Sequence, residues 1–265
     1  MFTSQSIFFY QNEMYTYPVK SENMENKQSQ PLDDEARKRI QKERRIYLFK
    51  LMTSSYADQQ FDLNNYQFNR VFLVHGFTGS GKDAIIDGFL KQNKKYPISK
   101  FVRTLTRSKR PGENEILSGY FVEKELFQHL KDRSRFFYCY EKYDGDEFGY
   151  DSIHLIFLLS RGHVIMIGGG EQNMPGLVEG IKSVFQNIHI TTVFINRNKD
   201  DIIEGMKKRG GDPEQIRKRT ESIEKNWTPK PQQKFDCIIW NDVLEDSINE
   251  FSDCVKKILG EQPGK

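Results

Sequence analysis

From about residue 68 onward, short apolar runs alternate with longer segments in which apolar residues recur at helical spacing. The runs predict buried strands at residues 71–74, 164–167, 192–195 and 237–240. The helical spacing predicts helices at residues 82–91, 176–185, 200–208, 213–225 and 243–259. Strands and helices that alternate in this way are typical of a parallel sheet with helices on both faces. The pattern therefore predicts an α/β fold of three layers, α/β/α, with a parallel core sheet.

Two segments before this alternation have a different character. Residues 1–31 are rich in Asn, Gln, Ser and Tyr with little apolar periodicity, which predicts a flexible tail. Residues 32–66 open with helix-start chemistry and carry one apolar helical face, which predicts an N-terminal helical extension. The basic run at residues 37–45 would suit an unknown partner or nucleic acid, but a solvated helix face packed on the main domain is the better interpretation.

Composition and charge narrow the class of protein. The 265 residues suffice for one α/β domain with an appendage, and the net charge of +3 gives no strong signal for nucleic-acid binding. No apolar stretch reaches the length of a membrane span, and the first ten residues lack the basic start of a secretory signal. Cys139, Cys237 and Cys254 are odd in number and widely spaced. They predict neither a disulfide framework nor a zinc site, and they favour a reducing cytoplasm.

Residues 76–82, GFTGSGK, follow the first predicted strand and lead into the first predicted helix. Closely spaced glycines let successive backbone N–H groups surround an anion, and a lysine at the end of the loop can reach the outer phosphates of a nucleotide. A glycine-rich turn with a chance lysine is the weaker alternative, because strand, loop and helix agree. The predicted nucleotide-binding residues are Gly76, Thr78, Gly79, Ser80, Gly81 and Lys82.

Asp83 departs from the usual phosphate-loop pattern G-x-x-x-x-G-K-[ST], in which a hydroxyl at this position touches Mg²⁺. A carboxylate is still a hard oxygen ligand, although it adds a negative charge beside the phosphates. We therefore expect ATP and Mg²⁺ as cofactors. Asp83 would bind the metal directly or order the waters bound to it.

The segment RTLTRSKRPGE at residues 103–113 resembles the T-x-R-x-x-R-x-G-E segment of guanylate kinases. Further similarities follow in the same order as in that family: Tyr120-Phe121-Val122, Phe148-Gly149-Tyr150, lid-like KRG and RKR at residues 208–210 and 217–219, and Trp240-Asn241-Asp242. The resemblance covers about residues 70–260. It implies a P-loop NTPase domain at 67–262, with an acceptor-binding insertion at about 99–151 and a helical lid at about 207–222.

The acceptor and lid arginines follow from chemistry and from this resemblance. Arg107 and Arg110 lie three residues apart and could bind an acceptor phosphate through paired guanidinium donors, unless they belong to a basic surface turn. That phosphate is already largely anionic near pH 7, so no general base is required. In guanylate kinases, lid arginines stabilise the transferred phosphoryl group. The resemblance therefore assigns catalysis to Lys82, Arg209 and Arg219, although residues 207–219 also suit a solvated helix pair.

The positions that contact the bases in guanylate kinases are partly matched and partly changed in this sequence. By resemblance, Asn241 and Asp242 contact adenine, although Asn-Asp after a strand is also ordinary turn chemistry. The predicted acceptor contacts are Arg103, Arg107, Arg110, Tyr120, Tyr138 and Tyr150. Among them, Arg103 replaces a serine, Tyr138 lies near a glutamate position, and Tyr150 replaces a Ser or Thr of the guanine site. Losing such polar partners removes discrimination of about 10⁴–10⁵, so strong GMP specificity is not expected.

Three functions remain open from the sequence. The first is ATP-dependent phosphoryl transfer to a small-molecule phosphate acceptor, a GMP-like nucleoside monophosphate with altered base recognition. The second is a sugar-phosphate kinase similar to ribose 1,5-bisphosphate phosphokinase, whose phosphate loop also ends in Lys-Asp, as Lys82-Asp83 does here. The third is a non-catalytic guanylate kinase-like binding module, which the intact phosphate loop disfavours.

Overall fold

The computed structural model describes residues 70–109, 113, 118–142, 145–159, 161–185, 187–209 and 213–260, and two strands nearer the N-terminus. The chain divides into two compact units, Met1–Arg39 and Ile40–Lys265. In the first unit, β1 (Gln5–Tyr10) and β2 (Glu13–Pro18) pair as an antiparallel ribbon within the segment predicted as a flexible tail. The predicted extension at residues 32–66 lies outside the described residues. The domain boundaries therefore stay predictions.

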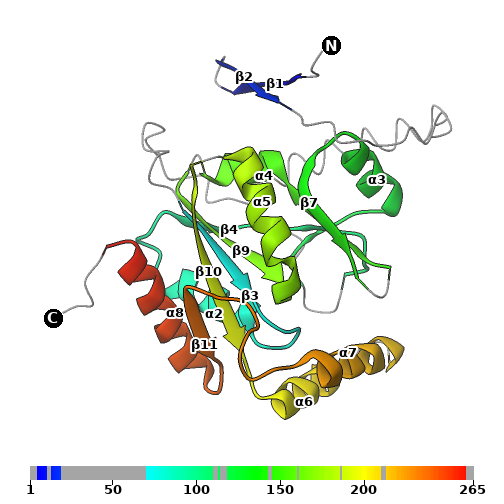
Figure 1. Ribbon diagram of the computed structural model, residues 1–265, viewed down its shortest axis with the longest axis vertical. Helices are drawn as coiled ribbons and strands as arrows, with labels where there is room; N and C mark the ends of the chain where they lie inside the picture. Colours follow the sequence, from blue (N-terminus) through cyan, green and yellow to red (C-terminus); the bar gives the residue numbers. More distant parts are fainter. Residues whose placement is uncertain are drawn as a thin grey trace. The chain divides into compact units, whose positions relative to one another are not determined.

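The second unit is built on a five-stranded parallel sheet (Figure 1). Its order is β11-β10-β3-β9-β4, and every neighbouring pair in it is parallel. The strands are β3 (Arg70–His75), β4 (Ile98–Lys100), β9 (His163–Gly169), β10 (His189–Asn196) and β11 (Cys237–Trp240). Four of them confirm the strands predicted from sequence. The three-residue edge strand β4 was not predicted.

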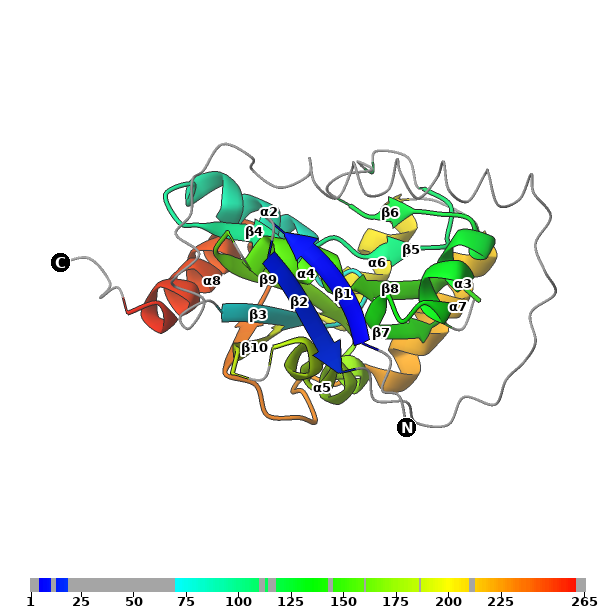
Figure 2. The same ribbon diagram turned by 90° about the horizontal axis from the view of Figure 1, so that it is seen from above.

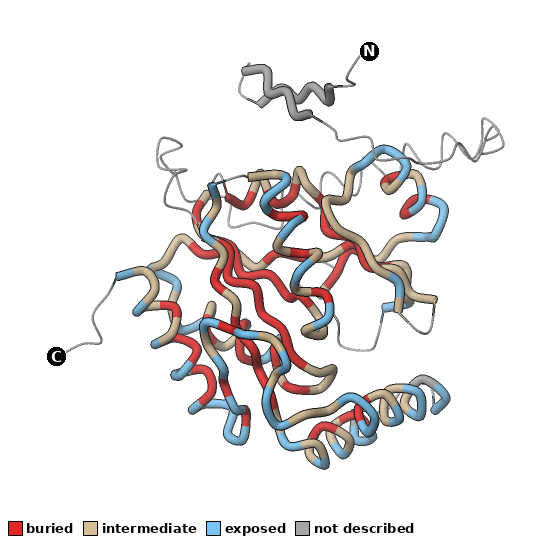
Figure 3. The backbone as a smooth tube through the Cα atoms, viewed as in Figure 1, coloured by how far each residue is buried: buried red, intermediate tan, exposed pale blue. Residues whose placement is uncertain are grey.

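Alternate residues of β3 serve the two faces of this sheet. Phe72 and Val74 pack with α2 (Lys82–Gln92) and α8 (Leu244–Ile258) on one face. Val71 and Leu73 pack with α4 (Ser152–Leu159) and α5 (Met174–Val184) on the other. The buried sheet lies between the two helical layers, as Figure 3 shows. The predicted three-layer α/β/α fold is confirmed.

The segment predicted as an insertion forms a second sheet beside the first (Figure 2). Its order is β6-β5-β8-β7, and α3 (Lys124–Asp132) belongs to the same segment. The strands are β5 (Thr104–Leu105), β6 (Tyr120–Phe121), β7 (Phe136–Glu141) and β8 (Glu147–Asp151). A buried ion pair joins the start of β7 to the end of β8, since Arg135 Nε lies 2.7 Å from Asp151 Oδ2. A short 3₁₀ turn, η2 (Glu171–Asn173), follows β9 of the main sheet.

Two further helices, α6 (Lys199–Arg209) and α7 (Pro213–Asn226), follow β10 and pack together at one end of the sheet (Figure 1). Ile202, Met206 and Ile223 form their shared core, and Phe77 of the phosphate loop packs against it. This pair includes the segment predicted as the lid. None of the helices in the described part of the chain has both the length and the apolar character that a bilayer crossing requires.

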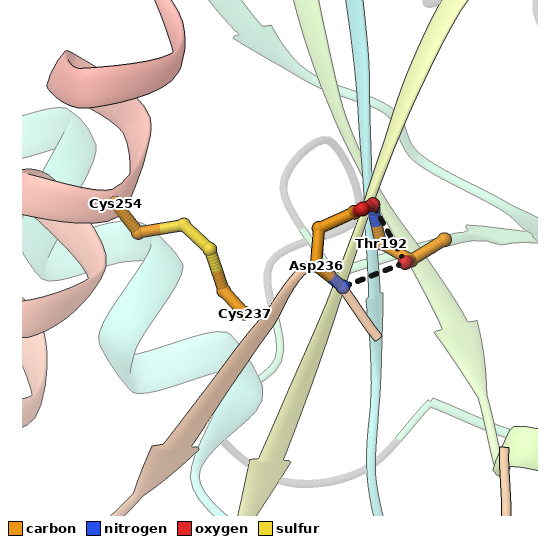
Figure 4. The surroundings of a disulfide bond; sticks show 4 residues. All are labelled: Thr192, Asp236, Cys237 and Cys254. Carbon is orange, nitrogen blue, oxygen red and sulfur yellow. Dashed lines mark hydrogen bonds between the residues drawn. A yellow bond between two sulfur atoms is a disulfide. The ribbon is translucent and has the colours of Figure 1, made fainter. Parts of the chain in front are cut away.

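The structure corrects one expectation about the cysteines. Cys237, at the start of β11, forms a disulfide with Cys254 of α8 (Figure 4), whereas the sequence predicted no disulfide. Seventeen residues separate the two in sequence, and only the packing of α8 beside the edge strand brings their Cα atoms to 6.8 Å. At the same edge, Asp236 Oδ2 accepts hydrogen bonds from the backbone N–H and the hydroxyl of Thr192. Strand β11 is thus fixed to neighbours on both sides.

Candidate active site

A cleft of about 1450 Å³ opens at the end of the sheet where the phosphate loop lies. The loop forms its floor, and the end of β4, the inserted sheet, the turn after β9 and helix α7 form its walls. Such a position, beyond the carboxyl ends of parallel strands, is where α/β folds bind ligands. The cleft therefore brings together residues from most of the predicted site segments.

Two glycines of the loop occupy places where no other residue fits. Gly81 has φ of 91° and leads directly into α2, and a Cβ atom on it would lie 2.1 Å from Asn241 Nδ2. Gly76 has φ of 143°, and a Cβ atom there would lie 2.1 Å from the carbonyl oxygen of Ile195. Backbone of this left-handed kind strongly favours glycine. The loop thus has the tight form that phosphate binding requires.

Lys82 is buried within the loop that it follows. Its Nζ donates to the carbonyl oxygens of Gly76 and Phe77, at 2.8 and 2.6 Å, and lies 3.3 Å from Ser80 Oγ. Burial lowers the pKa of Lys82 to about 8, against the opposing effect of the neighbouring Asp83 carboxylate. The Lys82 ammonium contacts two carbonyl oxygens and a hydroxyl, all of them neutral, and is well placed to bind phosphate oxygens.

Asn241 supports the loop from the side. Its Nδ2 donates to the carbonyl oxygen of Ser80 at 2.8 Å, and its Oδ1 accepts from Ser247 Oγ at 3.1 Å. Asp242 accepts a hydrogen bond from Trp240 Nε1 at 2.7 Å. Neither Asn241 nor Asp242 lines the cleft among its described residues. Their contact with adenine stays a prediction, and support of the loop is the role that the contacts give Asn241.

His75 connects the start of the loop to the turn after β9. Its side chain is fully buried, and Nδ1 lies 3.0 Å from the carbonyl oxygen of Gly170. Burial lowers the pKa of His75 to about 4, so the ring is neutral near pH 7 and Nδ1 carries the proton that it donates. In the same turn, Glu171 Oε2 accepts from the backbone N–H groups of Gln232 and Gln233. A carboxylate that could have supported Mg²⁺ is therefore used to hold the loop after α7.

Asp83 lies at the mouth of the loop, and its side chain is 64% exposed to the cleft. Lys100 Nζ lies 3.0 Å from Asp83 Oδ1 and 2.8 Å from Asp87 Oδ1, one helical turn later. The protein atoms around the cleft displace part of the water near Asp83, which acts to raise its pKa, but the charges of Lys100 and Arg103 outweigh this effect and the net pKa is lowered. Asp83 is thus ionised near pH 7, as a metal ligand must be.

Arg107 lines the cleft, on the side of the inserted sheet. Its guanidinium forms two hydrogen bonds with the Glu113 carboxylate, at 2.7 and 2.6 Å, and lies over the ring of Phe121. The pair holds the fork of Arg107 in one orientation and uses two of its donors, so a phosphate would compete with Glu113 for them. Arg110 lies outside the described residues, and its role stays a prediction.

The residues at the altered base-recognition positions differ in where they point. Arg103 lines the cleft, lies over the ring of Phe148, and has Nη1 3.4 Å from the hydroxyl of Tyr140. Tyr150 is fully buried, and its hydroxyl donates to the carbonyl oxygen of Ile167 at 2.7 Å. Tyr138 donates to Asn173 Oδ1 at 3.3 Å. Tyr138 and Tyr150 are not among the residues that line the cleft, so their contact with an acceptor stays a prediction.

Three more predicted residues have different surroundings. Tyr120 is 2% exposed and packs with Val102 and Leu126 inside the inserted sheet, so it too is absent from the described cleft lining. Arg219 of α7 does line the cleft, as a lid arginine should. The side chain of Arg209, at the end of α6, lies outside the described residues. Of the two predicted lid arginines, Arg219 is thus the one whose place in the cleft the structure describes.

The structure also adds residues that sequence reasoning missed. Lys100, Tyr140 and Asp87 line the cleft, although none was predicted to do so. Lys100 lies at the carboxyl end of a parallel strand, where ligand sites form, but the three-residue strand β4 was itself not predicted. Tyr140 carried no signal in the sequence. Its place depends on the register of β7 against β8, in which Tyr140 pairs with Phe148.

Fold and loop together define the class of protein: a P-loop kinase, with a nucleotide-binding phosphate loop, an inserted sheet and a helix pair around one cleft. The sequence profile of the guanylate kinase family matches residues 68–258. The chain belongs to the guanylate kinase family. Its own activity is therefore that of a kinase, and the acceptor is the open question.

Individual relatives agree with this assignment. A guanylate kinase of Thermus thermophilus is 29% identical over 184 residues, which cover 69% of this chain and 78% of that protein. A guanylate kinase of Vibrio vulnificus is 24% identical over 187 residues, 70% of this chain and 86% of that protein. The crystal structure of guanylate kinase from Anaplasma phagocytophilum superimposes with a TM-score of 0.50 at 17% identity, covering 73% and 88% of the two chains. The last comparison supports the fold alone.

Proposed function

We propose that this protein transfers the γ-phosphoryl group of Mg-ATP to a small acceptor that already carries a phosphate. The observation that carries the proposal is that Lys82 of the phosphate loop and Arg107 of the acceptor segment line the same cleft. A donor phosphate and an acceptor phosphate bound by these two residues would meet in that cleft. Positioning and charge stabilisation supply most of the catalysis in phosphoryl transfer.

Each residue has a role in this scheme. The loop N–H groups and Lys82 bind the nucleotide phosphates, and the Asp83 carboxylate is the protein oxygen available to the metal. Mg²⁺ brought by ATP would neutralise part of the charge on the β- and γ-phosphates. Arg107, joined by Arg110, orients the acceptor phosphate. Arg219, joined by Arg209, faces the transferred group from α7 when the helix pair closes.

The first candidate for the acceptor is a nucleoside monophosphate whose base is not guanine. Arg103 lines the cleft at a base-recognition position, and its guanidinium offers donors to a ring carbonyl or ring nitrogen. The carboxylate and hydroxyl groups that would accept from the guanine edge are replaced here by Arg103, Tyr138 and Tyr150. We therefore expect GMP to be a poor substrate.

The second candidate is a sugar phosphate that carries no base. The buried Tyr150 favours it, because the tyrosine ring fills the place of a small hydroxyl residue and its own hydroxyl is bonded to Ile167. A site closed in this way suits a smaller acceptor. In that case Arg103 would bind a second anionic group of the sugar.

The non-catalytic binding module is the weaker alternative. Such a module does not need the constrained glycines at Gly76 and Gly81 or the buried Lys82. All three are present and form a complete phosphate loop.

The test is ADP production from Mg-ATP by purified protein, with Lys82→Ala as the control. The acceptor panel is GMP, dGMP, AMP, CMP, UMP, ribose 1,5-bisphosphate and no acceptor. Turnover with one acceptor, lost in Lys82→Ala, supports the kinase and names its substrate class. If every acceptor gives the same rate as the no-acceptor control and ATP does not bind, the proposal is wrong and the binding module takes its place.

The cytoplasm is the compartment that we propose for this activity, since ATP and phosphorylated metabolites are abundant there. The disulfide between Cys237 and Cys254 is the observation that weighs against a reducing compartment. Thiol trapping in intact cells would decide, because a fully reduced pair is expected in the cytoplasm.

A partner for the basic run at residues 37–45 also stays a proposal. If deletion of residues 1–60 leaves activity and localisation unchanged, that proposal is wrong.

A further inference from the structure

Lys100 ends the edge strand β4, and its side chain is only 8% exposed. Its Nζ lies 3.0 Å from Asp83 Oδ1 and 2.8 Å from Asp87 Oδ1. All three residues line the cleft beside the phosphate loop. One buried ammonium therefore holds two carboxylates at the place where a nucleotide would bring its phosphates.

These two carboxylates present an electrostatic problem that the usual phosphate loop does not have. Asp83 and Asp87 lie four residues apart on α2, so their like charges face the same side of the helix. The usual loop has a neutral hydroxyl at the position of Asp83. Without a nearby cation, the pair would repel the triphosphate of ATP. Lys82 and Arg103 lie near Asp83 as well, and Lys100 is the cation that contacts both carboxylates.

The donor groups at this place fit the metal that accompanies ATP. Carboxylate oxygen is a hard ligand that Mg²⁺ accepts. Lys100 engages Oδ1 of Asp83, and no hydrogen bond to Oδ2 occurs within the described part of the chain. The Lys100 ammonium, itself a cation, is held by Oδ1 of Asp83 and Oδ1 of Asp87. Asp83 can therefore meet a metal while it remains paired with Lys100.

We infer that Lys100 is a positioning residue for the nucleotide and its metal, acting through Asp83 and Asp87. Its ammonium lowers the negative charge that ATP meets at the loop, and it limits how tightly the two carboxylates bind a divalent cation before ATP arrives. This inference rests on the proposed use of Mg-ATP. The three groups carry a formal net charge of −1 with Lys100 present (two carboxylates and one ammonium) and −2 without it.

The test is Lys100→Met, which keeps an unbranched side chain of similar length and removes the charge. Binding of metal-free ATP, measured by calorimetry in EDTA, should weaken by about tenfold, and binding of Mn²⁺ without nucleotide, measured by electron paramagnetic resonance, should strengthen by about tenfold. Opposite changes are the signature of a charge effect. A general loss of structure would weaken both.

Asp87→Asn gives the reverse experiment at an exposed position, where the side chain is 56% exposed and folding is not at risk. It brings the formal charge of the three groups to zero. Metal-free ATP should then bind more tightly than in the wild type, and Mn²⁺ more weakly. Lys100→Arg keeps the charge and should retain the wild-type affinity for both probes.

Lys91→Met is the matched control, because it also replaces one lysine by methionine. Lys91 lies on α2, the helix of Asp83 and Asp87, but eight residues beyond Asp83, about 12 Å along the axis. The inference is overturned if Lys100→Met behaves as Lys91→Met does, or if both affinities change in the same direction. Neither titration uses an acceptor or turnover. If no acceptor gives turnover but the affinities for ATP and Mn²⁺ shift in opposite directions, only the proposed reaction is contradicted. If the wild-type protein binds no ATP, both the proposed reaction and this inference are wrong.

Discussion

The side-chain amide of Asn241 donates a 2.8 Å hydrogen bond to the backbone carbonyl of Ser80, across 161 positions of sequence. The bond joins the segment after the edge strand β11 to the phosphate loop. Both groups are buried, so neither has water as an alternative partner. Asn241 thereby sets the shape of the loop without facing the cleft itself.

Replacing Asn241 by Ala should weaken ATP binding by about tenfold and lower the free energy of unfolding by about 1–3 kcal/mol, because the Ser80 carbonyl loses its donor in a buried place. Inorganic triphosphate distinguishes loop support from contact with adenine. Loss of loop support weakens triphosphate and ATP alike, whereas loss of an adenine contact weakens ATP only. Asp242→Asn, which changes only the partner of Trp240, should leave triphosphate binding unchanged.

The affinity for ATP should fall as the pH rises through about 8. Burial lowers the pKa of Lys82 to about 8, and only its protonated form attracts phosphate. Above that pH, binding must include uptake of a proton, which costs up to tenfold in affinity per pH unit. Calorimetry from pH 7 to 9.5 checks this. Lys82→Arg should show a flat profile over the range, and an equally flat wild-type profile would contradict the expectation.

Opening the base-recognition positions should admit GMP. Arg103→Ser with Tyr150→Ser restores small hydroxyl groups, and we expect kcat/KM for GMP to rise at least about tenfold, a small part of the 10⁴–10⁵ that a complete polar site can supply. Tyr150→Phe keeps the ring, removes the hydroxyl that bonds to Ile167 and lies beside Arg103, and should show no gain. No change in GMP turnover in a folded double variant would mean that Tyr150 does not close the guanine position.

Reduction of the disulfide should destabilise the edge of the sheet. Cys254→Ser frees β11 from α8 and should lower the free energy of unfolding by about 3 kcal/mol, as expected for a loop of this length. Chemical denaturation of oxidised protein measures it, with Cys139→Ser as the control, because Cys139 is the free cysteine. Equal midpoints with and without dithiothreitol would show that the bond contributes nothing.

The protein should lose stability as the pH falls from about 6.5 to 4. Burial lowers the pKa of His75, His154 and His163 to about 4, so the unfolded chain binds more protons than the folded one across this window. Denaturation at pH 7 and pH 5 gives the slope. His154→Asn keeps a donor near the Nδ1 position, which lies 3.2 Å from the carbonyl oxygen of Val102, and removes the titration. Its slope should be shallower, and a slope equal to the wild-type one would exclude His154 as a source.

Much of the main fold was predictable because its signals are local. A strand such as β3 is a continuous apolar run with both faces buried, and a helix such as α2 follows a loop whose glycines fix its start. The inserted sheet was harder, since β5 and β6 have two residues each and no period can be read from them. Their pairing follows from tertiary packing.

The lining of the cleft was predictable where one segment supplies it, as in the phosphate loop and at Arg107. Contacts were not predictable where distant segments meet. Lys100 of strand β4 reaches Asp83 of helix α2, Asn241 reaches Ser80 across 161 positions of sequence, and Cys237 meets Cys254 only through helix packing. The direction of Tyr150 was also hidden, because its type and position do not show whether a side chain faces the cleft or the core.

The pairing of Arg107 with Glu113 has a consequence for what the cleft admits. The carboxylate of the protein already occupies the donors that an acceptor phosphate needs, so binding is an exchange of one anion for another. A singly charged anion gains little by that exchange, whereas a phosphate dianion with further contacts in the cleft gains more. We expect an internal competitor of this kind to select ligands by charge, so that chloride and simple carboxylates bind poorly beside Arg107.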